Sequence, residues 1–235
     1  MTAQEIMIEL QSLGDENTKR IWLKHGIKEP FFGVKIQDLK PIEKKIKKDY
    51  QLAKNLFATG NADAMYLAGL IADDEKMTRE DLQTWVKAAV SSNISDFAVP
   101  WVACGGQYGY ELALVWINSD VDYIAQAGWA TLAGWVAVKP DAELDIPAYS
   151  SLLKRVEQNI HKVSDGVRKK MNGFIISVGA YVAALTDEAN ATAKAIGVVT
   201  VDANGTACKV PDAIEYILKA KARGSMEKKK KTLKC

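Results

Sequence analysis

Thirteen short stretches with helical periodicity follow one another along the chain, and most of the connections between them are brief. These stretches are residues 2–12, 16–25, 36–49, 50–58, 62–72, 79–90, 95–103, 108–118, 121–138, 146–160, 165–184, 187–196 and 212–222. Residues 198–201 read as a strand, but a single strand of this length cannot build a sheet. The sequence therefore predicts helices packed on helices.

Capping signals support several of the predicted boundaries. Thr78 and Thr186 each precede two acidic residues within three positions, a pattern typical of an N-cap and a first helical turn. Asn61 stands where it can cap the helix that follows it. Gly197 and Pro140 mark helix ends.

Two stretches indicate how the helices pack. Residues 121–138 carry Val121, Ala125 and Leu132 on one side and small residues on the opposite side, and residues 165–184 are similar. A helix that is apolar or small all round is buried on several faces. We therefore predict an all-α, HEAT-like α-solenoid of stacked antiparallel helix pairs, with an irregular helical bundle as the alternative. Residues 1–222 would form a single helical domain, and residues 223–235 a basic C-terminal tail.

Composition excludes several classes of protein. Hydrophobic residues make up 48% and charged residues 26%, which is typical of a folded globular chain. No apolar run is long enough to span a membrane, and the first residues show no signal-peptide pattern. Three cysteines without a CxxC pair and two histidines favour neither disulfides nor a metal centre. We expect a monomer in the reducing cytoplasm, with no metal and no cofactor.

Charge is distributed unevenly, although the net charge is only +2. Residues 15–50 carry 10 Lys/Arg against 6 Asp/Glu, and residues 219–235 carry 8 against 1. Residues 57–145 are acidic, with 13 Asp/Glu against 4 Lys/Arg. Basic ends of this kind suit an anionic partner. Solvated helix faces and a frayed tail would explain the same runs without a partner.

Common catalytic motifs are missing from the sequence. There is no GxxxxGK[ST], no HExxH and no GxSxG. The stretch CGGQYGY at 104–110 does not match GxGxxG and follows no strand. Pattern alone therefore predicts a helical solenoid with basic ends and no identified chemistry.

Four strings extend the interpretation. They are HGIKEPFFGVK at 25–35, GNADAMYLAGLI at 60–71, VRKKMNGFII at 167–176 and NGTACKVP at 204–211. With them the chain resembles the DNA alkylation repair superfamily of HEAT-like proteins, whose best-known branch is the AlkD-type DNA glycosylases. The likeness covers essentially the whole chain, but none of these strings is a catalytic signature.

The resemblance implies duplex or structured DNA as the partner. Enzymes of the AlkD type bind duplex DNA on a basic, concave face and release N3- or N7-alkylated purines without pulling the base into a pocket. A carboxylate stabilises the positive charge that develops on the sugar, aromatic side chains contact the backbone, and an arginine holds a phosphate.

Only part of that machinery matches this sequence. By the resemblance, the catalytic carboxylate falls at Asp96 and one aromatic at Phe174, which we take as the candidate catalytic residues. A second aromatic position falls at Ser92, and the arginine position falls at Ala127. The candidate contacts to the DNA backbone are cationic side chains near the start of one helix and in the tail: Arg168, Lys169, Lys170, Lys228, Lys229, Lys230 and Lys231.

Each candidate also has a purely structural explanation. Asp96 could charge the start of a helix, Phe174 lies on an apolar stripe, and the cations could be ordinary surface charge. Three hypotheses follow: a DNA-binding protein with little or no base excision, a glycosylase that depends on Asp96, and a protein-binding solenoid whose partner meets the acidic middle. Duplex binding that weakens with salt would separate the last from the other two.

Overall fold

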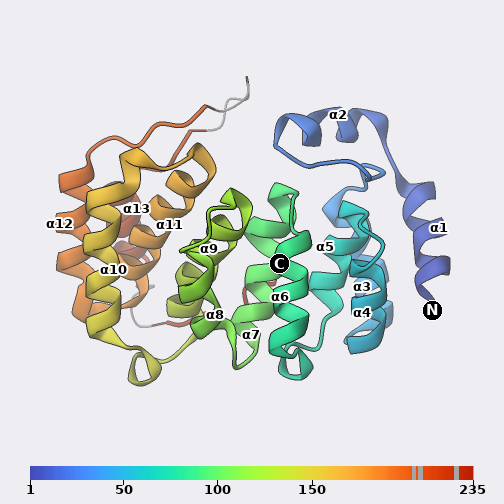
Figure 1. The fold of residues 1–235 in the computed structure, drawn as a ribbon, viewed down its shortest axis with the longest axis horizontal. Coiled ribbons are helices and arrows are strands. Elements are labelled where there is room, and N and C mark those ends of the chain that lie inside the picture. Colours follow the sequence, from blue (N-terminus) through green and yellow to red (C-terminus); the bar gives the residue numbers. More distant parts are fainter. Residues whose placement is uncertain (203–204, 206–208, 225–227, 235) are drawn as a thin grey trace. The chain divides into compact units, whose positions relative to one another are not determined.

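All the regular secondary structure in the part of the chain that the structure describes is helical. This computed structural model describes residues 1–202, 205, 209–224 and 228–234 (Figure 1). The α-helices are α1 (Ala3–Leu13), α2 (Glu16–Lys24), α3 (Ile36–Ile46), α4 (Tyr50–Phe57), α5 (Ala62–Ile71), α6 (Arg79–Ala88), α7 (Val99–Gly105), α8 (Gly109–Trp116), α9 (Asp122–Val138), α10 (Ile146–Asn159), α11 (Asp165–Tyr181), α12 (Thr186–Ile196) and α13 (Ala213–Ala222). Each coincides with a predicted helix, so the predicted all-α organisation is confirmed.

The chain divides into two compact units. Among the described residues, the first contains 1–112, Gly205 and Lys234, and the second contains 113–202, 209–224 and 228–233. The first unit holds α1 to α7 and the start of α8, and the second holds α9 to α13. The predicted boundary between a domain at 1–222 and a tail at 223–235 stays a prediction.

Helix α5 is the central helix of the first unit. All ten of its residues are buried, and α1, α3, α4 and α7 pack against it. Its N-terminus is capped by Asn61, whose side chain accepts hydrogen bonds from the N–H groups of Asp63 and Ala64, so that predicted cap is confirmed. The close packing is explained by Ala64, Ala68 and Gly69, which let neighbouring backbones approach.

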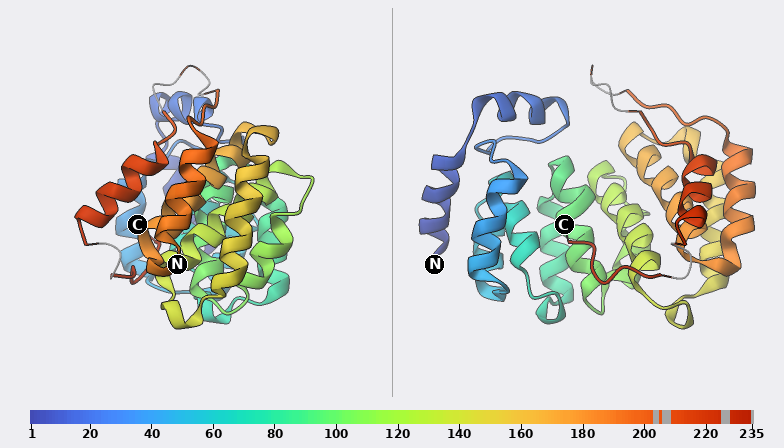
Figure 2. Two further views of the ribbon diagram at one scale, coloured as in Figure 1. Left: turned by 90° about the vertical axis from the view of Figure 1, so that its left-hand side faces the viewer. Right: turned by 180° about the vertical axis from the view of Figure 1, so that it is seen from behind.

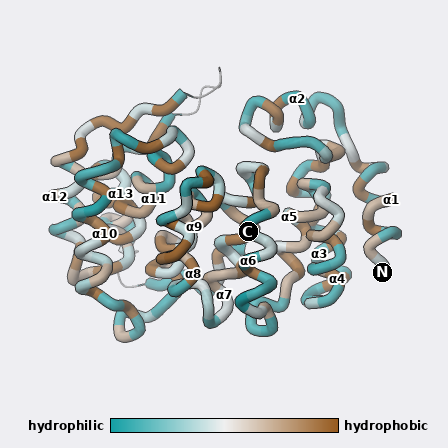
Figure 3. Tube along the Cα trace, viewed as in Figure 1, coloured by the Kyte–Doolittle hydropathy of each residue, from teal (hydrophilic) through white to brown (hydrophobic). Residues whose placement is uncertain are grey.

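Helix α11 has the same place in the second unit. It packs against α9, α12 and α13 (Figures 1 and 2). The outer helix α10 has one buried face, formed by Tyr149, Leu152, Leu153 and Val156. It shows alternating hydrophilic and hydrophobic bands in Figure 3, as expected of a helix with one face toward the core.

Three local predictions need correction. The helix predicted at 95–103 begins as a π-helical segment, Ile94–Ala98, which continues into α7. Residues 198–201 form no strand, because the chain leaves α12 at Gly197 with no neighbouring strand to pair with. Thr186 does not cap α12: it is the first helical residue, and its hydroxyl donates to the carbonyls of Gly179 and Val182.

Other boundaries agree with the sequence. Thr78 caps α6 in a capping box with Asp81, as predicted. Among the described residues, no helix is both long enough and apolar enough to cross a membrane. Cys208, Cys235 and half of the string at 204–211 lie outside the described part of the chain.

Candidate nucleic-acid interface

The surface around Asp96 belongs to the first unit and is held in place by α5. Gly69 of α5 meets Ala98 so closely that a Cβ on the glycine would lie 2.8 Å from the Cβ of Ala98. The intervening segment, Ile94–Ala98, is π-helical, a conformation that is rare and frequent at functional sites. Asp96 lies in the middle of this segment and is half-buried, with one carboxylate oxygen out of contact with solvent.

An aromatic side chain stands next to this carboxylate in sequence. Phe97 is 46% exposed, and its ring centroid lies 5.9 Å from that of Trp101. Trp101 in turn packs edge-on against Tyr66 of α5. Phe97 was not singled out from the sequence, since one exposed phenylalanine gives no pattern that distinguishes it from the core.

Ser92 lies where the resemblance implies a tryptophan, and it forms hydrogen bonds to a neighbouring loop. Its hydroxyl donates to the carbonyl of His25 at 2.7 Å, and its N–H donates to that of Gly26. The neighbouring Ser91 hydroxyl bonds to Lys28. These contacts join the loop at 25–28 to the start of the π-helical segment, and Ser92 offers no aromatic face.

The second unit contains the remaining candidates. Phe174 of α11 is completely buried, with Trp129 edge-on at 5.2 Å and Tyr149 stacked at 6.0 Å between ring centroids. Ala127 of α9 is also fully buried. Neither side chain reaches the surface, so burial favours a packing role for Phe174, while its catalytic role stays a prediction.

Arg168 forms a dense set of local bonds at the start of α11. Its guanidinium donates to the carbonyls of Ile160, Val163 and Thr200 and to the carboxylate of Asp165. These hydrogen bonds connect Arg168 to the loop before α11 and to the segment after α12. Lys169 is exposed and Lys170 is half-buried, so Lys169 is the more accessible of the two to a phosphate.

The tail lysines differ from one another. Lys229 donates to the carbonyls of Val136 and Tyr181, near the ends of α9 and α11, and pairs with Asp141 at 2.7 Å. Lys228, Lys230 and Lys231 are exposed. A role in binding the DNA backbone therefore suits these three better than Lys229, whose ammonium is already bonded to two carbonyls and to Asp141.

Lys234 was not among the candidates and is also used structurally. In the first unit its ammonium donates to the Ala72 carbonyl at 2.9 Å and to Asp74 at 2.6 Å. Burial lowers the pKa of Lys234 and raises the pKa of Asp74, against the attraction within the pair. No cluster of three or more metal-ligating side chains lies in the part of the chain that the structure describes.

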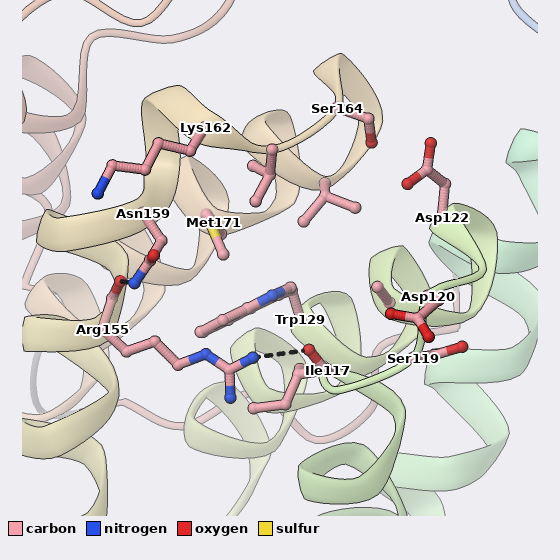
Figure 4. Close-up of a pocket in the computed structure, with 13 residues that line it drawn as sticks. Ile117, Ser119, Asp120, Asp122, Trp129, Arg155, Asn159, Lys162, Ser164 and Met171 are labelled. Carbon is pink, nitrogen blue, oxygen red and sulfur yellow. Dashed lines mark hydrogen bonds between the residues drawn. The ribbon is translucent and has the colours of Figure 1, made fainter.

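One cation in the second unit was missed by sequence reasoning. Arg155 of α10 is half-buried and lines a cavity with Trp129 and the start of α11 (Figure 4). No sequence pattern distinguishes it, because a single arginine on an amphipathic helix looks like surface charge.

Comparison with known proteins places this geometry in a family. A family model described as "DNA alkylation repair enzyme" matches residues 6–217. Two curated relatives, the uncharacterized proteins Lmo0209 of Listeria monocytogenes and Lin0241 of Listeria innocua, are each 33% identical over 228 residues. Each alignment covers 95% of this chain and 99% of the relative.

A solved structure agrees with the sequence relatives. It is described as "A new family of proteins related to the HEAT-like repeat DNA glycosylases with affinity for branched DNA structures". It matches with a TM-score of 0.90 and 34% identity and covers 100% of both chains. The predicted HEAT-like fold is thus confirmed, and the chain belongs to the DNA alkylation repair enzyme family.

Proposed function

We propose that this protein binds branched DNA through the phosphate backbone and has little or no activity as an alkylpurine glycosylase. The observation that carries the proposal is the full-length likeness to a protein related to the HEAT-like glycosylases with affinity for branched DNA. Exposed cations at Lys169, Lys228, Lys230 and Lys231 support it, since they are available to phosphates.

The sites that correspond to the glycosylase machinery argue against excision. Ser92 is bonded to a loop carbonyl, and Ala127 and Phe174 are buried. Asp96 alone retains a half-exposed carboxylate. A glycosylase that depends on Asp96 is the second candidate, favoured by its position in a π-helical segment beside the exposed Phe97.

The test measures binding of a four-way junction, a three-way junction and a linear duplex of equal length by fluorescence anisotropy. We expect both junctions to bind more tightly than the duplex, with little dependence on base sequence. Affinity should fall steeply with salt, and each phosphate contact removed should flatten the log–log slope by about 0.9.

The informative variant replaces Lys228, Lys230 and Lys231 by glutamine, with Lys87→Gln, Lys154→Gln and Lys194→Gln as a charge-matched control at exposed helix positions. Loss of junction binding in the first variant and not in the second supports the proposal. Equal affinity for junction and duplex, or no binding at low salt, contradicts it. The second result favours a protein partner. Location in the cytoplasm and the monomeric state stay predictions.

A further inference from the structure

The π-helical segment of the first unit turns two of its side chains toward solvent. Its other residues are buried: Ile94, Ser95 and Ala98. Asp96 is half-buried, and Phe97 is exposed. The N–H of Val99 bonds to the carbonyl of Ile94, which is the wide backbone turn of a π-helix, and the segment packs on α5. A fixed piece of backbone therefore presents a carboxylate and an aromatic ring on consecutive residues.

Two buried aromatic side chains support the ring of Phe97. Its centroid lies 5.9 Å from that of Trp101 in α7, and the Trp101 centroid lies 5.2 Å from that of Tyr66 in α5 (Figure 1). Trp101 and Tyr66 belong to the core, whereas 46% of the Phe97 surface is open to solvent. Single exposed apolar side chains are common on proteins. A ring that rests on the core is in addition pre-organised, so it loses little conformational entropy when a ligand covers it.

Phe97 differs from the other well-exposed aromatic side chain. Among the described residues, Phe97 and Tyr216 are the aromatic side chains with more than 40% of their surface exposed. The ammonium of Lys219 lies 5.3 Å from the centre of the Tyr216 ring. Tyr216 belongs to α13 of the second unit and lies outside the π-helical segment. It is therefore a matched control for Phe97.

The charges around Phe97 favour an uncharged ligand at the ring itself. The carboxylate of Asp96, on the preceding residue, disfavours a phosphate there. The adjoining loop carries the exposed Lys28, whose backbone N–H donates to the Ser91 hydroxyl at 2.8 Å. The ammonium of Lys28 is available to a phosphate beside the ring. This arrangement suits a flat, neutral group that is attached to a phosphate backbone.

Branched DNA presents such a group and a linear duplex does not. Phosphates are common to both forms, so cations alone give affinity without a preference for a branch. At a branch point the stacking of base pairs is interrupted, and the face of an unpaired base becomes accessible. Aromatic side chains stack on exposed bases of any sequence, because every base has a flat π-face.

We propose that Phe97 stacks on an unpaired base at the branch point and thereby gives this protein its preference for branched over linear DNA. The inference rests on the proposed function and names the part of the DNA that this surface recognises. Phe97 acts on specificity, whereas the exposed lysines act on affinity for every DNA.

The first experiment compares three DNAs by fluorescence anisotropy: a three-way junction with unpaired adenines at the branch, the same junction with abasic sites in their place, and a linear duplex. We expect the native chain to bind the adenine junction at least about five-fold tighter than the abasic one. The slope of affinity against salt should be the same for the two junctions, because they carry the same phosphates.

Phe97→Leu is the informative variant. Leucine keeps an apolar contact with Trp101 but has no flat face, so the difference between the adenine and abasic junctions should disappear. Affinity for the abasic junction and for the duplex should stay unchanged. Phe97→Trp should restore the difference, and Tyr216→Leu, the matched control, should leave all three affinities unchanged.

Thermal unfolding separates recognition from folding. If Phe97 only stabilised the first unit, Phe97→Leu would lower the melting temperature and weaken all three DNAs alike, and that result overturns the proposal. Equal affinity of the native chain for the adenine and abasic junctions also overturns it, as does a difference that persists in Phe97→Leu. Selective loss of the difference at an unchanged melting temperature supports it.

A second readout does not depend on branch preference. The protein is saturated with a short single strand that carries 2-aminopurine, a base whose emission is quenched when it stacks on an aromatic ring. Emission should be lower with the native chain than with Phe97→Leu. Failure of the native chain to bind either junction overturns the proposed function alone, since this quenching still supports a base-stacking role of Phe97. Equal emission with the two proteins overturns that role.

Discussion

Lys229 shows how one residue in a charge run differs from its neighbours. Its ammonium satisfies carbonyls near the ends of two helices, where the dipole favours a cation, and pairs with Asp141. We predict that Lys229→Met lowers the stability of the protein by about 1–3 kcal/mol, because those carbonyls lose a buried partner. A fall of several degrees in the melting temperature would show it.

Lys228→Met is the matched control for that substitution. It removes the same charge from the adjacent, exposed residue and should leave the melting temperature nearly unchanged. Equal effects of the two substitutions would mean that Lys229 contributes to stability only through net charge.

Sequence reasoning could place these residues but not distinguish them. The four lysines of the run cannot be told apart in the sequence, because contact of one of them with a helix end depends on tertiary structure. The same holds for Arg168, whose guanidinium is surrounded by carbonyls, and for Trp129, whose unpaired N–H no spacing reveals. The candidate site was therefore predicted as a set of residue types rather than as a geometry.

Asp81 ties α4 to α6 through three hydrogen-bond donors. Its carboxylate accepts from the Tyr50 hydroxyl at 2.6 Å, from Lys54 at 2.7 Å and from the Thr78 N–H at 3.1 Å. Burial would raise the pKa of Asp81, but these donors together hold it below the usual value of 3.8. We predict that Asp81→Asn costs about 2–3 kcal/mol at pH 7.

The stabilisation by Asp81 should depend on pH, because folding lowers the pKa of this carboxyl. Because the folded pKa of Asp81 is depressed, its contribution is present above pH 3.8 and is lost as the pH falls through the folded value. The stability difference between Asp81→Asn and the native chain should therefore shrink in acid. Urea unfolding at pH 7 and at several acidic pH values measures it, and a constant difference would contradict it. Asp63 and Asp74 have pKa values raised by burial, but they act equally in both proteins.

Two glycines test how closely the helices of the second unit pack. A Cβ on Gly128 of α9 would lie 2.7 Å from the backbone nitrogen of Ile117, whereas a Cβ on Gly173 of α11 would meet nothing within 4 Å. We predict that Gly128→Ala destabilises by about 1–3 kcal/mol and that Gly173→Ala stabilises by about 0.5–1 kcal/mol. Denaturant unfolding compares them, and a stabilising Gly128→Ala would exclude the close contact.

Helix positions were largely predictable because each helix carries its own periodicity and several carry their own caps. The errors occurred where tertiary contacts decide. Thr186 resembles an N-cap in the sequence. In the structure its hydroxyl donates to the carbonyls of Gly179 and Val182 instead, and Thr186 is the first residue of α12. The π-helical turn at Ile94–Ala98 ends where Gly69 closely approaches Ala98, a tertiary contact that periodicity does not encode.

The family-like strings predicted the fold of the whole molecule better than its chemistry, because their contacts are structural. Asp63, in the string at 60–71, is buried and accepts from the N–H groups of Phe32, Gly33 and Val34 in the string at 25–35. Asn172, in the string at 167–176, is buried and donates to the Pro211 carbonyl. Contacts of this kind stabilise the fold and do not depend on whether the protein acts on a base.

Base excision by this protein depends on how much of the glycosylase machinery it retains. In the glycosylases that this chain resembles, a carboxylate, aromatic faces and a phosphate-holding arginine act together. Here Ser92 supplies no aromatic face, Ala127 is buried, and only Asp96 retains a half-exposed carboxylate. The loss of one positioned electrostatic group commonly costs about 10²–10³ in rate, although such losses need not multiply. We predict that the release of N7- or N3-methylpurines is absent or slower than in an AlkD-type enzyme by at least that factor.

A single-turnover assay on methylated duplex DNA compares the native chain with Asp96→Asn. This substitution removes the charge and keeps the side-chain size. Background-level release by both proteins agrees with a DNA-binding role that does not use the carboxylate for chemistry. Rapid release that disappears in Asp96→Asn would instead establish a glycosylase, and it would require that the π-helical segment and Phe97 position the sugar without the missing tryptophan and arginine.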